Sequence, residues 1–239
     1  MQHTLQSAET GALIYWFDIR PEVVQDWLNW YLRDHMPSRV GSTFTTGRCF
    51  EAIDAPSSHM VLFETSSPEA LLAPSYLHLL GTVSDDDRKR RGWYANTVRM
   101  TARVRTRLGA GVGSVLSVIR FDQSLHTGPQ TLMSALAGIP GVGSVWIAEH
   151  DPSIRSRMDS VRVTGHQDLS AAGALMTEAA TDSDARLAVS TFKAKTALSG
   201  THAPESRPPG RYRLMNCMPA CSAAGTGQRP MALSRPWCR

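Results

Sequence analysis

The sequence lacks the features that mark several large classes of protein. No stretch approaches the ~18 consecutive apolar residues of a transmembrane helix, so no membrane partner is expected. The opening residues, MQHTLQSAETG, do not join a positive start to an apolar core, so no secretory signal is expected and the cytoplasm is the expected location. G-x-S-x-G, Walker A, H-E-x-x-H and close paired-cysteine motifs do not occur. The sequence therefore predicts no cofactor.

Cysteine is scarce, with four residues at positions 49, 217, 221 and 238. Cys49 lies in a segment of alternating apolar residues, where we expect a small buried side chain. Cys217 and Cys221 have no second Cys or His pair nearby at the spacing of zinc ligands. The sequence therefore predicts no metal site.

The body of the chain also lacks an excess of charge of one sign. The net charge is +4, but residues 200–239 contain six Arg and one acidic residue, which leaves the rest at −1. A nucleic-acid-binding domain is expected to carry its basic residues on the folded body, so no nucleic-acid partner is predicted. The basic run at 88–91 follows three aspartates and is typical of a solvated segment.

Hydrophobic periodicity and turn residues predict two successive β-α-β-β-α-β units. In the first unit the expected strands and helices are 11–18 (strand), 21–36 (helix), 45–54 and 59–65 (strands), 67–80 (helix) and 97–107 (strand). In the second unit they are 113–121 (strand), 129–136 (helix), 143–150 and 172–179 (strands), 183–198 (helix) and 211–218 (strand). The segment 151–168 is expected to be a polar connection, and 180–198 contains a strand in an alternative assignment.

This order predicts an α+β fold. An antiparallel sheet with helices on one face must cover its other, apolar face. Two tandem ferredoxin-like units in one chain can cover each other and close a structure of the dimeric α/β-barrel type. We expect a first unit at 1–108, a second at 109–218 and a flexible tail at 219–239. The chain is then a monomer with an internal pseudo-dimer, or a homodimer.

His35 is the candidate catalytic residue. It follows Trp27 and Tyr31 on one face of the expected helix, at spacings that point it toward the sheet. A histidine there can transfer a proton near neutral pH, and the end of the helix favours its charged form. The alternative is a histidine that caps backbone carbonyls. Tyr31 is expected to donate a hydrogen bond to the substrate or to orient His35; its alternative is a core aromatic residue.

Six further residues are expected to bind the substrate, namely Trp27, Trp30, Arg39, Asn96, Arg99 and Arg103. The two tryptophans would form a wall for a flat, conjugated molecule, although packing alone also explains them. The arginines, with the asparagine, could hold a carboxylate because guanidinium binds it bidentately. The alternative is that these are exposed strand arginines that form ion pairs with Glu51 or Glu64.

The pattern Trp27-x2-Trp30-Tyr31-x3-His35-Met36-Pro37-x-Arg39 resembles the first helix of EthD-like and related dimeric α/β-barrel proteins. Further matching pieces are Gly47-Arg48, Leu62-Phe63-Glu64, Ser67-Pro68-Glu69 and Tyr94-Ala95-Asn96. The resemblance covers about residues 11–120, and the second unit follows it only by pattern. The superfamily includes muconolactone-type isomerases, polyketide cyclases, cofactor-free monooxygenases and haem-degrading enzymes, so the resemblance does not select a reaction.

Two functions are consistent with these patterns. The first is a cofactor-independent isomerase, cyclase or lyase that moves a proton on an aromatic-derived or polyunsaturated acid. The second is a non-catalytic EthD-like protein that binds a small molecule or assists a partner. Haem binding is a third possibility that the resemblance allows. Any chemistry is expected in the first unit, because the second lacks the corresponding residue types.

Overall fold

Eight antiparallel strands close into a barrel in the computed structural model, which describes residues 9–123, 129–165, 167–198 and 208–220. The strands of this part of the chain are β1 (Thr10–Ile19), β2 (Thr46–Asp54), β3 (His59–Thr65), β4 (Tyr94–Gly109), β5 (Val115–Phe121), β6 (Val142–His150), β7 (Gly173–Ala179) and β8 (Gly210–Pro219). Around the barrel they run β1-β3-β2-β8-β5-β7-β6-β4. Each neighbouring pair is antiparallel. The α+β prediction is confirmed.

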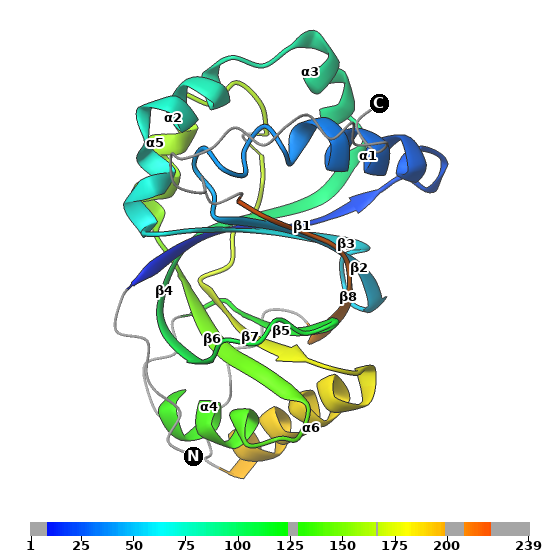
Figure 1. Cartoon of the computed structure of the whole chain (residues 1–239), viewed down its shortest axis with the longest axis vertical. Helices are drawn as coiled ribbons and strands as arrows, with labels where there is room; N and C mark the ends of the chain where they lie inside the picture. The colour runs from blue at the N-terminus through cyan, green and yellow to red at the C-terminus, as the bar shows by residue number, and fades with distance from the viewer. Residues whose placement is uncertain (1–8, 124–128, 166, 199–207, 221–239) are drawn as a thin grey trace, which may run out of the picture.

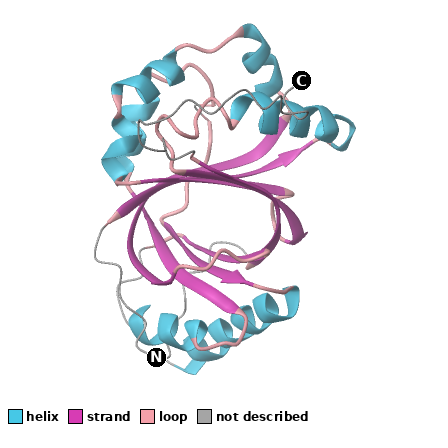
Figure 2. Cartoon of the chain, viewed as in Figure 1, coloured by secondary structure: helices cyan, strands magenta, loops and turns pink. Residues whose placement is uncertain are grey.

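Helices cover two opposite sides of this barrel (Figure 2). They are α1 (Val24–Trp30), α2 (Pro74–Gly81), α3 (Asp85–Arg91), α4 (Pro129–Ala137), α5 (Pro152–Asp159) and α6 (Asp182–Leu198), with a π-helical turn at Tyr31–His35 and short 3₁₀ turns at Pro21–Val23 and Pro68–Leu72. Figure 1 shows α1, α2, α3 and α5 on one side and α4 and α6 on the other. Although α5 lies late in the chain, it packs on the side of the early helices.

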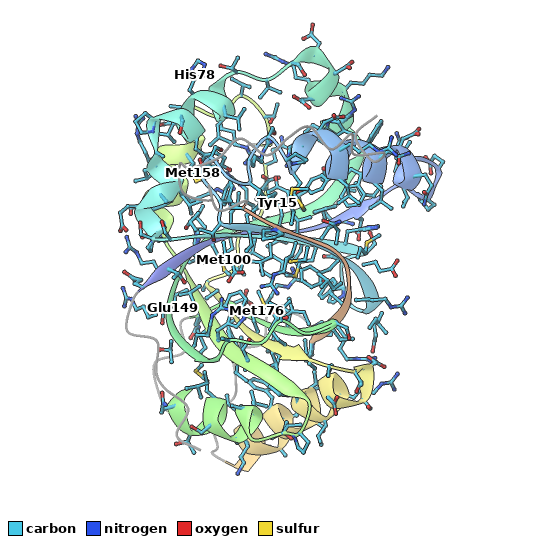
Figure 3. All side chains as sticks on the ribbon, in the orientation of Figure 1. Tyr15, His78, Met100, Glu149, Met158 and Met176 are labelled. Carbon is cyan, nitrogen blue, oxygen red and sulfur yellow. The ribbon has the colours of Figure 1, made fainter. Side chains whose placement is uncertain are left out.

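Alternating side chains of each strand separate the barrel interior from the helix layers. On β1, Ile14 and Trp16 are fully buried inside the barrel, and Tyr15 between them points the other way. In Figure 3, Tyr15 lies on the helix side of the sheet, whereas Met100 and Met176 lie between the two halves of the barrel. One apolar cluster from both halves of the chain therefore fills the interior.

Charged residues also cross the interior near one end of the barrel. The Arg48 guanidinium on β2 lies 2.5 Å from the Glu178 carboxylate on β7, and both side chains are 1% exposed. The same guanidinium lies 3.2 Å from Glu64 on β3. Buried charges are retained only when they are paired. Arg48 and Glu178 therefore tie the first half of the chain to the second.

Three segments differ from the sequence-based prediction. The helix expected at 67–80 is broken, because Pro74 holds Ala73 in an extended conformation and starts α2 afresh. The expected polar connection 151–168 contains α5, which Asp151 caps by accepting hydrogen bonds from the backbone N–H groups of Ser153 and Ile154. The charged run at 85–91 is helical, with Ser84 as its N-cap. The alternative strand within 180–198 is wrong, since α6 occupies this segment.

The glycine-rich segment 109–113 joins β4 to β5, as the sequence predicts for a connection between the halves. Gly109 has a φ of +78°, and a Cβ atom there would lie 2.2 Å from the Gly143 carbonyl oxygen. The Gly111 N–H donates to that same carbonyl at 3.2 Å. Glycine is required here because two backbones touch. Of the tail expected at 219–239, residues 221–239 lie outside the described residues.

Candidate functional site

A cavity of about 400 Å³ lies between the outer face of the sheet and the helices of the first half. Its floor comes from alternate residues of two neighbouring strands, Tyr15 and Phe17 on β1 and Val61 and Phe63 on β3. The alternation that places Trp16 in the barrel places these side chains here. The floor is therefore flat and largely aromatic, which suits a planar ligand.

The π-helical turn at Tyr31–His35 forms one wall. Its wider repeat is visible in the hydrogen bond from the Met36 N–H to the Tyr31 carbonyl, five residues back, at 2.8 Å. The His35 ring lies with its centroid 4.5 Å from the Trp30 ring and 4.8 Å from the Tyr31 ring. Single π turns occur often at functional sites, and this one brings both proposed catalytic residues to the cavity.

His35 is neutral at neutral pH. Burial lowers its pKa well below the ordinary 6.5, and the positive charges of Arg39 and Arg91 add to the effect. The expectation that the helix end would favour the charged form is therefore wrong, because desolvation outweighs the dipole. Within the described part of the chain, the His35 ring makes no hydrogen bond to a backbone carbonyl. Arg39 donates to the His35 carbonyl at 2.9 Å and Ser38 donates to it at 2.8 Å.

Three tyrosines line the cavity near His35. Burial raises the pKa of the Tyr31, Tyr76 and Tyr94 hydroxyls, so that each stays protonated. Tyr94 accepts a hydrogen bond from the Trp27 indole N–H at 2.7 Å. The hydroxyls of Tyr31 and Tyr76 make no hydrogen bond to any residue that the structure describes. These hydroxyls are available to a ligand.

The opposite end of the cavity is built around the buried carboxylate of Asp168. Arg162 lies 2.9 Å from it and Arg91 forms a second ion pair with it. Both arginines also donate to the Tyr15 hydroxyl, which in turn donates to Asp168. Burial alone would raise the pKa of Asp168, but Arg91 and Arg162 outweigh it and lower the pKa. The carboxylate is therefore ionised.

Arginines outnumber carboxylates at this end. The four arginines 91, 99, 155 and 162 contact two carboxylates, Asp159 and Asp168. Burial and the neighbouring Arg162 lower the pKa of Arg99 to about 10. This partly buried cluster carries two excess positive charges, which attract an anion, although Asp34 and Asp87 also line the cavity. The cavity thus has an aromatic end with an imidazole and a cationic end.

The second half of the chain completes this end of the cavity. Arg162 and Thr164 line the cavity, and Asp168 lies behind them; all three belong to the connection between α5 and β7. This connection is held to β4 by two backbone hydrogen bonds of 2.9 Å. The Leu169 N–H donates to the Thr97 carbonyl, and the Arg99 N–H donates to the Leu169 carbonyl. The cationic end therefore exists only where the two halves meet.

The structure brings most of the proposed site residues together. Five line the cavity, namely Trp30, Tyr31, His35, Arg39 and Arg99. The other three do not. Trp27 is fully buried behind Tyr94, and Asn96 is exposed and donates to Asp18 at 2.7 Å. Arg103 forms ion pairs with Glu9, Glu69 and Asp151 outside the cavity. Arg103 is therefore a partly exposed strand arginine held in ion pairs, although its partners are not the Glu51 or Glu64 of the alternative, whereas Arg99 is 2% exposed.

Sequence reasoning missed several residues of the cavity. Tyr15 had a signal, because it lies two residues from Phe17 on the helix-facing side of an alternating strand. Arg91 sits at the end of a run that composition assigns to solvent. Arg162 and Asp168 come from the expected polar connection, and nothing in their spacing indicates a contact with Tyr15, 147 and 153 residues away along the chain.

The described residues offer little for a metal or haem. They contain no group of three or more His, Cys, Asp or Glu side chains that could hold a metal ion. A histidine that binds a metal almost always donates its other ring nitrogen to a carboxylate or carbonyl. No carboxylate or carbonyl of the described residues accepts a hydrogen bond from the His35 ring. Cys217 is exposed, and Cys221 lies outside the described residues.

None of the helices that the structure describes combines the length and apolar character needed to cross a lipid bilayer. No protein-family model matches the sequence, and a search of curated proteins finds no match. Solved structures do match the fold.

An anthrone oxidase-like protein superposes with a TM-score of 0.59 at 11% identity, over 94% of this chain and 100% of that chain. A proposed monooxygenase from Lactobacillus acidophilus matches with a TM-score of 0.55 at 10% identity, over 88% of this chain and 96% of that one. A second, from Fusobacterium nucleatum, matches with a TM-score of 0.53 at 10% identity, over 90% and 96%. At such identities the likeness shows a shared fold alone, here the closed antiparallel barrel with helices on two sides.

Proposed function

We propose that the chain is a cofactor-independent enzyme that moves a proton on a flat, aromatic-derived or polyunsaturated acid. The reaction would be of the isomerase, cyclase or lyase type. One observation carries the proposal: a half-buried histidine with a lowered pKa lies against two aromatic rings in a cavity that arginines also line. A base, a planar wall and an anion site are the three parts that such a reaction needs.

The proposed step begins with the neutral His35 imidazole. The arginines at the cationic end bind the carboxylate of the ligand, and the aromatic floor holds its plane. His35 then takes a proton from a carbon next to a carbonyl group, and the electron pair moves into that carbonyl to form an enolate. Return of the proton from the imidazolium to a different carbon completes an isomerisation. The hydroxyls of the tyrosines that line the cavity would donate hydrogen bonds to the developing negative charge.

Oxygenation of the ligand is a second candidate reaction. It is favoured by the names of the matching structures, an anthrone oxidase-like protein and two proposed monooxygenases. The same enolate can react with O₂ instead of regaining its proton. With anthrone as the ligand, the overall reaction would be anthrone + O₂ → anthraquinone + H₂O, in which O₂ is the oxidant. The first step is shared, so His35 has the same role in both candidates.

The non-catalytic alternative is an EthD-like protein that binds a similar anion in the same cavity. Binding then occurs without any proton exchange. Binding alone therefore does not separate the alternatives, whereas exchange of carbon-bound hydrogen does.

We further propose that the chain is a tandem pair of ferredoxin-like units, 1–108 and 109–218. In support, the strand order β4-β1-β3-β2 of the early strands is followed by β8-β5-β7-β6 of the late ones, with the same positions in each set. In the late set, Phe121, Met133 and Phe192 pack between sheet and helices and are at most 1% exposed. The activity would therefore belong to the first unit, supported by the second.

Phenylpyruvate is a suitable probe, because it carries an aromatic ring, a carboxylate and an acidic CH₂ group next to a carbonyl. Loss of its CH₂ signal in D₂O, followed by NMR, measures proton abstraction. We expect acceleration by the wild-type chain and a loss of about 10²–10⁴-fold in His35→Gln, the range typical of a removed general base. Oxygen uptake with anthrone tests the second candidate.

His78→Gln is the matched control. His78 lies on α2, is exposed and points away from the cavity (Figure 3), so this variant should exchange at the wild-type rate. Bound phenylpyruvate that exchanges no faster than the free acid would contradict an enzyme and favour the binding protein.

A further inference from the structure

Tyr94 differs from the other cavity tyrosines in the direction of its hydrogen bonding. Its hydroxyl oxygen accepts a hydrogen bond from the Trp27 indole N–H at 2.7 Å. An indole N–H can only donate, so the Tyr94 proton cannot point back toward Trp27. No described residue accepts that proton, and Tyr94 lines the cavity. The Tyr94 hydroxyl is therefore a donor with an open partner position.

Tyr15, on the same floor, shows the contrast. Its oxygen accepts from Arg91 and Arg162, and its proton goes to Asp168. The proton and both lone pairs of the Tyr15 hydroxyl are thus used in hydrogen bonds within the protein, so this hydroxyl cannot form a further hydrogen bond to a ligand. Two tyrosines in one cavity thus carry different roles, one structural and one open.

The position of Tyr94 suits a donor to the reacting part of a ligand. Its ring lies 4.7 Å from the Phe17 ring on the floor, and the Arg91 guanidinium lies 5.0 Å from its centroid. Its hydroxyl is close enough to that of Tyr31 to raise the pKa of Tyr31, second to burial. The Tyr31 ring in turn lies 4.8 Å from the His35 ring, centroid to centroid. Tyr94 therefore lies between the cationic end and the base.

The bond from Trp27 also strengthens this donor. An oxygen that accepts one hydrogen bond releases its own proton more readily into a second one. Burial raises the pKa of the Tyr94 hydroxyl, although the hydrogen bond from Trp27 acts in the opposite direction. The hydroxyl therefore stays protonated. Trp27 is fully buried, so the indole holds the phenol in one orientation.

We propose that Tyr94 is a further catalytic residue, the hydrogen-bond donor to an anionic oxygen of the ligand, and that Trp27 is its positioning residue. This inference rests on the proposed function, in which an enolate oxygen forms. It also narrows the ligand class to planar acids that carry, besides the carboxylate, a carbonyl or phenol oxygen able to hold negative charge.

The test uses a probe that needs no catalysis, 3-(4-hydroxy-3-nitrophenyl)propionate. Its carboxylate suits the arginines and its coloured phenolate reports a donor through absorbance. The matched probe is the methyl ether, which cannot form the anion. Affinities of both are measured for the full-length chain, for Tyr94→Phe and for Trp27→Phe.

In Tyr94→Phe we expect phenolate affinity to fall about tenfold or more and ether affinity to stay within about twofold. Trp27→Phe should give a smaller loss, again for the phenolate alone, because the tyrosine remains but loses its orientation. A general packing defect would weaken both probes equally. This second variant keeps the test decisive if Tyr94→Phe does not fold.

Equal phenolate affinity in the wild type and both variants would overturn the role of Tyr94. Equal losses for phenolate and ether would also overturn it, as they indicate packing alone. Failure of the wild type to bind either probe is a different result, since it contradicts the proposed cavity function itself. The two proposals therefore fail in distinguishable ways.

Discussion

The ionisation of His35 sets the pH range in which the proposed base works. Burial, with Arg39 and Arg91, holds its pKa well below 6.5, so the imidazole is neutral above that value. We expect exchange of phenylpyruvate to be independent of pH through the neutral range and to fall only well below pH 6.5. Initial rates across a pH series measure this. Free imidazole, whose pKa is unshifted, serves as the comparison, and a wild-type rate that halves near pH 6.5 would contradict burial of the base.

The same shift affects stability with a definite sign. In the unfolded chain His35 takes up a proton as the pH falls through about 6.5, whereas the folded chain resists it. The unfolded state binds more protons in this window, so the contribution of His35 to stability is present above pH 6.5 and is lost as the pH falls. His35→Gln should remove this part of the pH dependence of unfolding.

Asp168 is the residue on which the cationic end depends. Its side chain is 1% exposed and lies against Arg91, Arg99 and Arg162. Asp168→Asn keeps the shape but leaves buried guanidinium groups without a counter-charge, so we expect a loss on the order of 3–5 kcal/mol in the free energy of unfolding. Urea denaturation measures it.

An exposed aspartate supplies the control. Asp85→Asn removes a charge from a fully exposed side chain whose ion-pair partner among the described residues is Arg88, and its effect should be close to zero. Added phenylpyruvate should partly restore the stability of Asp168→Asn if its carboxylate can take the vacant place. Identical denaturation curves for the two variants would contradict the role given to Asp168.

At the scale of elements, α3 is held to the body through few side chains. The helix has no buried residue, and its sequence is entirely charged. Arg90 lies over the Trp30 ring, with 5.2 Å to its centroid, and Arg91 lies between the rings of Tyr15 and Tyr94, at 5.1 and 5.0 Å. Since Asp87 and Arg91 line the cavity, α3 is a wall whose position depends on these arginine contacts.

Replacing Arg91 should therefore loosen α3 without unfolding the barrel. In Arg91→Met we expect faster amide hydrogen exchange across 82–91 and unchanged exchange in β1 and β4, because the ion pair with Asp168 and both ring contacts are lost. Mass spectrometry of exchanged peptides measures this. Arg88→Met, which removes only an exposed pair with Asp85, should leave exchange as in the wild type, and equal protection in both variants would contradict the anchoring role of Arg91.

The order of elements could be predicted from the sequence because local signals determine it. Strand alternation at 11–18 and 59–65, and prolines at helix starts, placed strands and helices close to their observed bounds. The π turn at Tyr31–His35 could not be predicted, since its extra residue per turn changes spacing without changing composition. The helix α3 was missed because a charged run has no apolar face and is stabilised by its caps and a few long-range contacts.

The site residues also fall into two groups, those brought together by local structure and those brought together by long-range contacts. Tyr31, His35 and Trp30 share one short helix, so their proximity is local and predictable. Arg99 and Arg103 differ in the carboxylates with which they form ion pairs. Arg99 contacts Asp159 and Asp168, whereas Arg103 contacts Asp151 and two glutamates. These partners come from distant parts of the chain. Sequence periodicity predicts which face of the sheet a strand residue occupies, but it does not predict which helix or loop packs against that residue.

At the scale of the whole molecule, closure of the barrel joins the two halves along two seams. β2 pairs with β8 at one seam and β4 with β6 at the other. No strand of the described barrel keeps a free edge, so one chain satisfies the pairing that separate copies would otherwise provide. We expect a monomer near 26.1 kDa, which light scattering after size exclusion measures; a stable dimer would contradict this.

Neither half should therefore be stable alone. Division between Gly111 and Val112 gives two fragments, each with an exposed apolar sheet face that contributes to the common interior cluster. We expect each fragment alone to bind a hydrophobic dye and to lack a cooperative thermal transition, and a mixture to recover both barrel stability and phenylpyruvate binding. Recovery of binding requires both fragments, because Arg162 and Thr164 come from the second half and His35 from the first.

The Arg48–Glu178 pair gives this prediction a residue-level check, since its members lie in different fragments. Arg48→Met in the first fragment leaves Glu178 buried without a partner charge and should weaken reassociation by on the order of 10²–10⁴-fold, corresponding to about 3–5 kcal/mol. Arg20→Met, which replaces an arginine side chain that is 56% exposed, should reassociate like the wild type. If both variants reassociate equally, the buried pair does not hold the halves together and apolar contact alone closes the barrel.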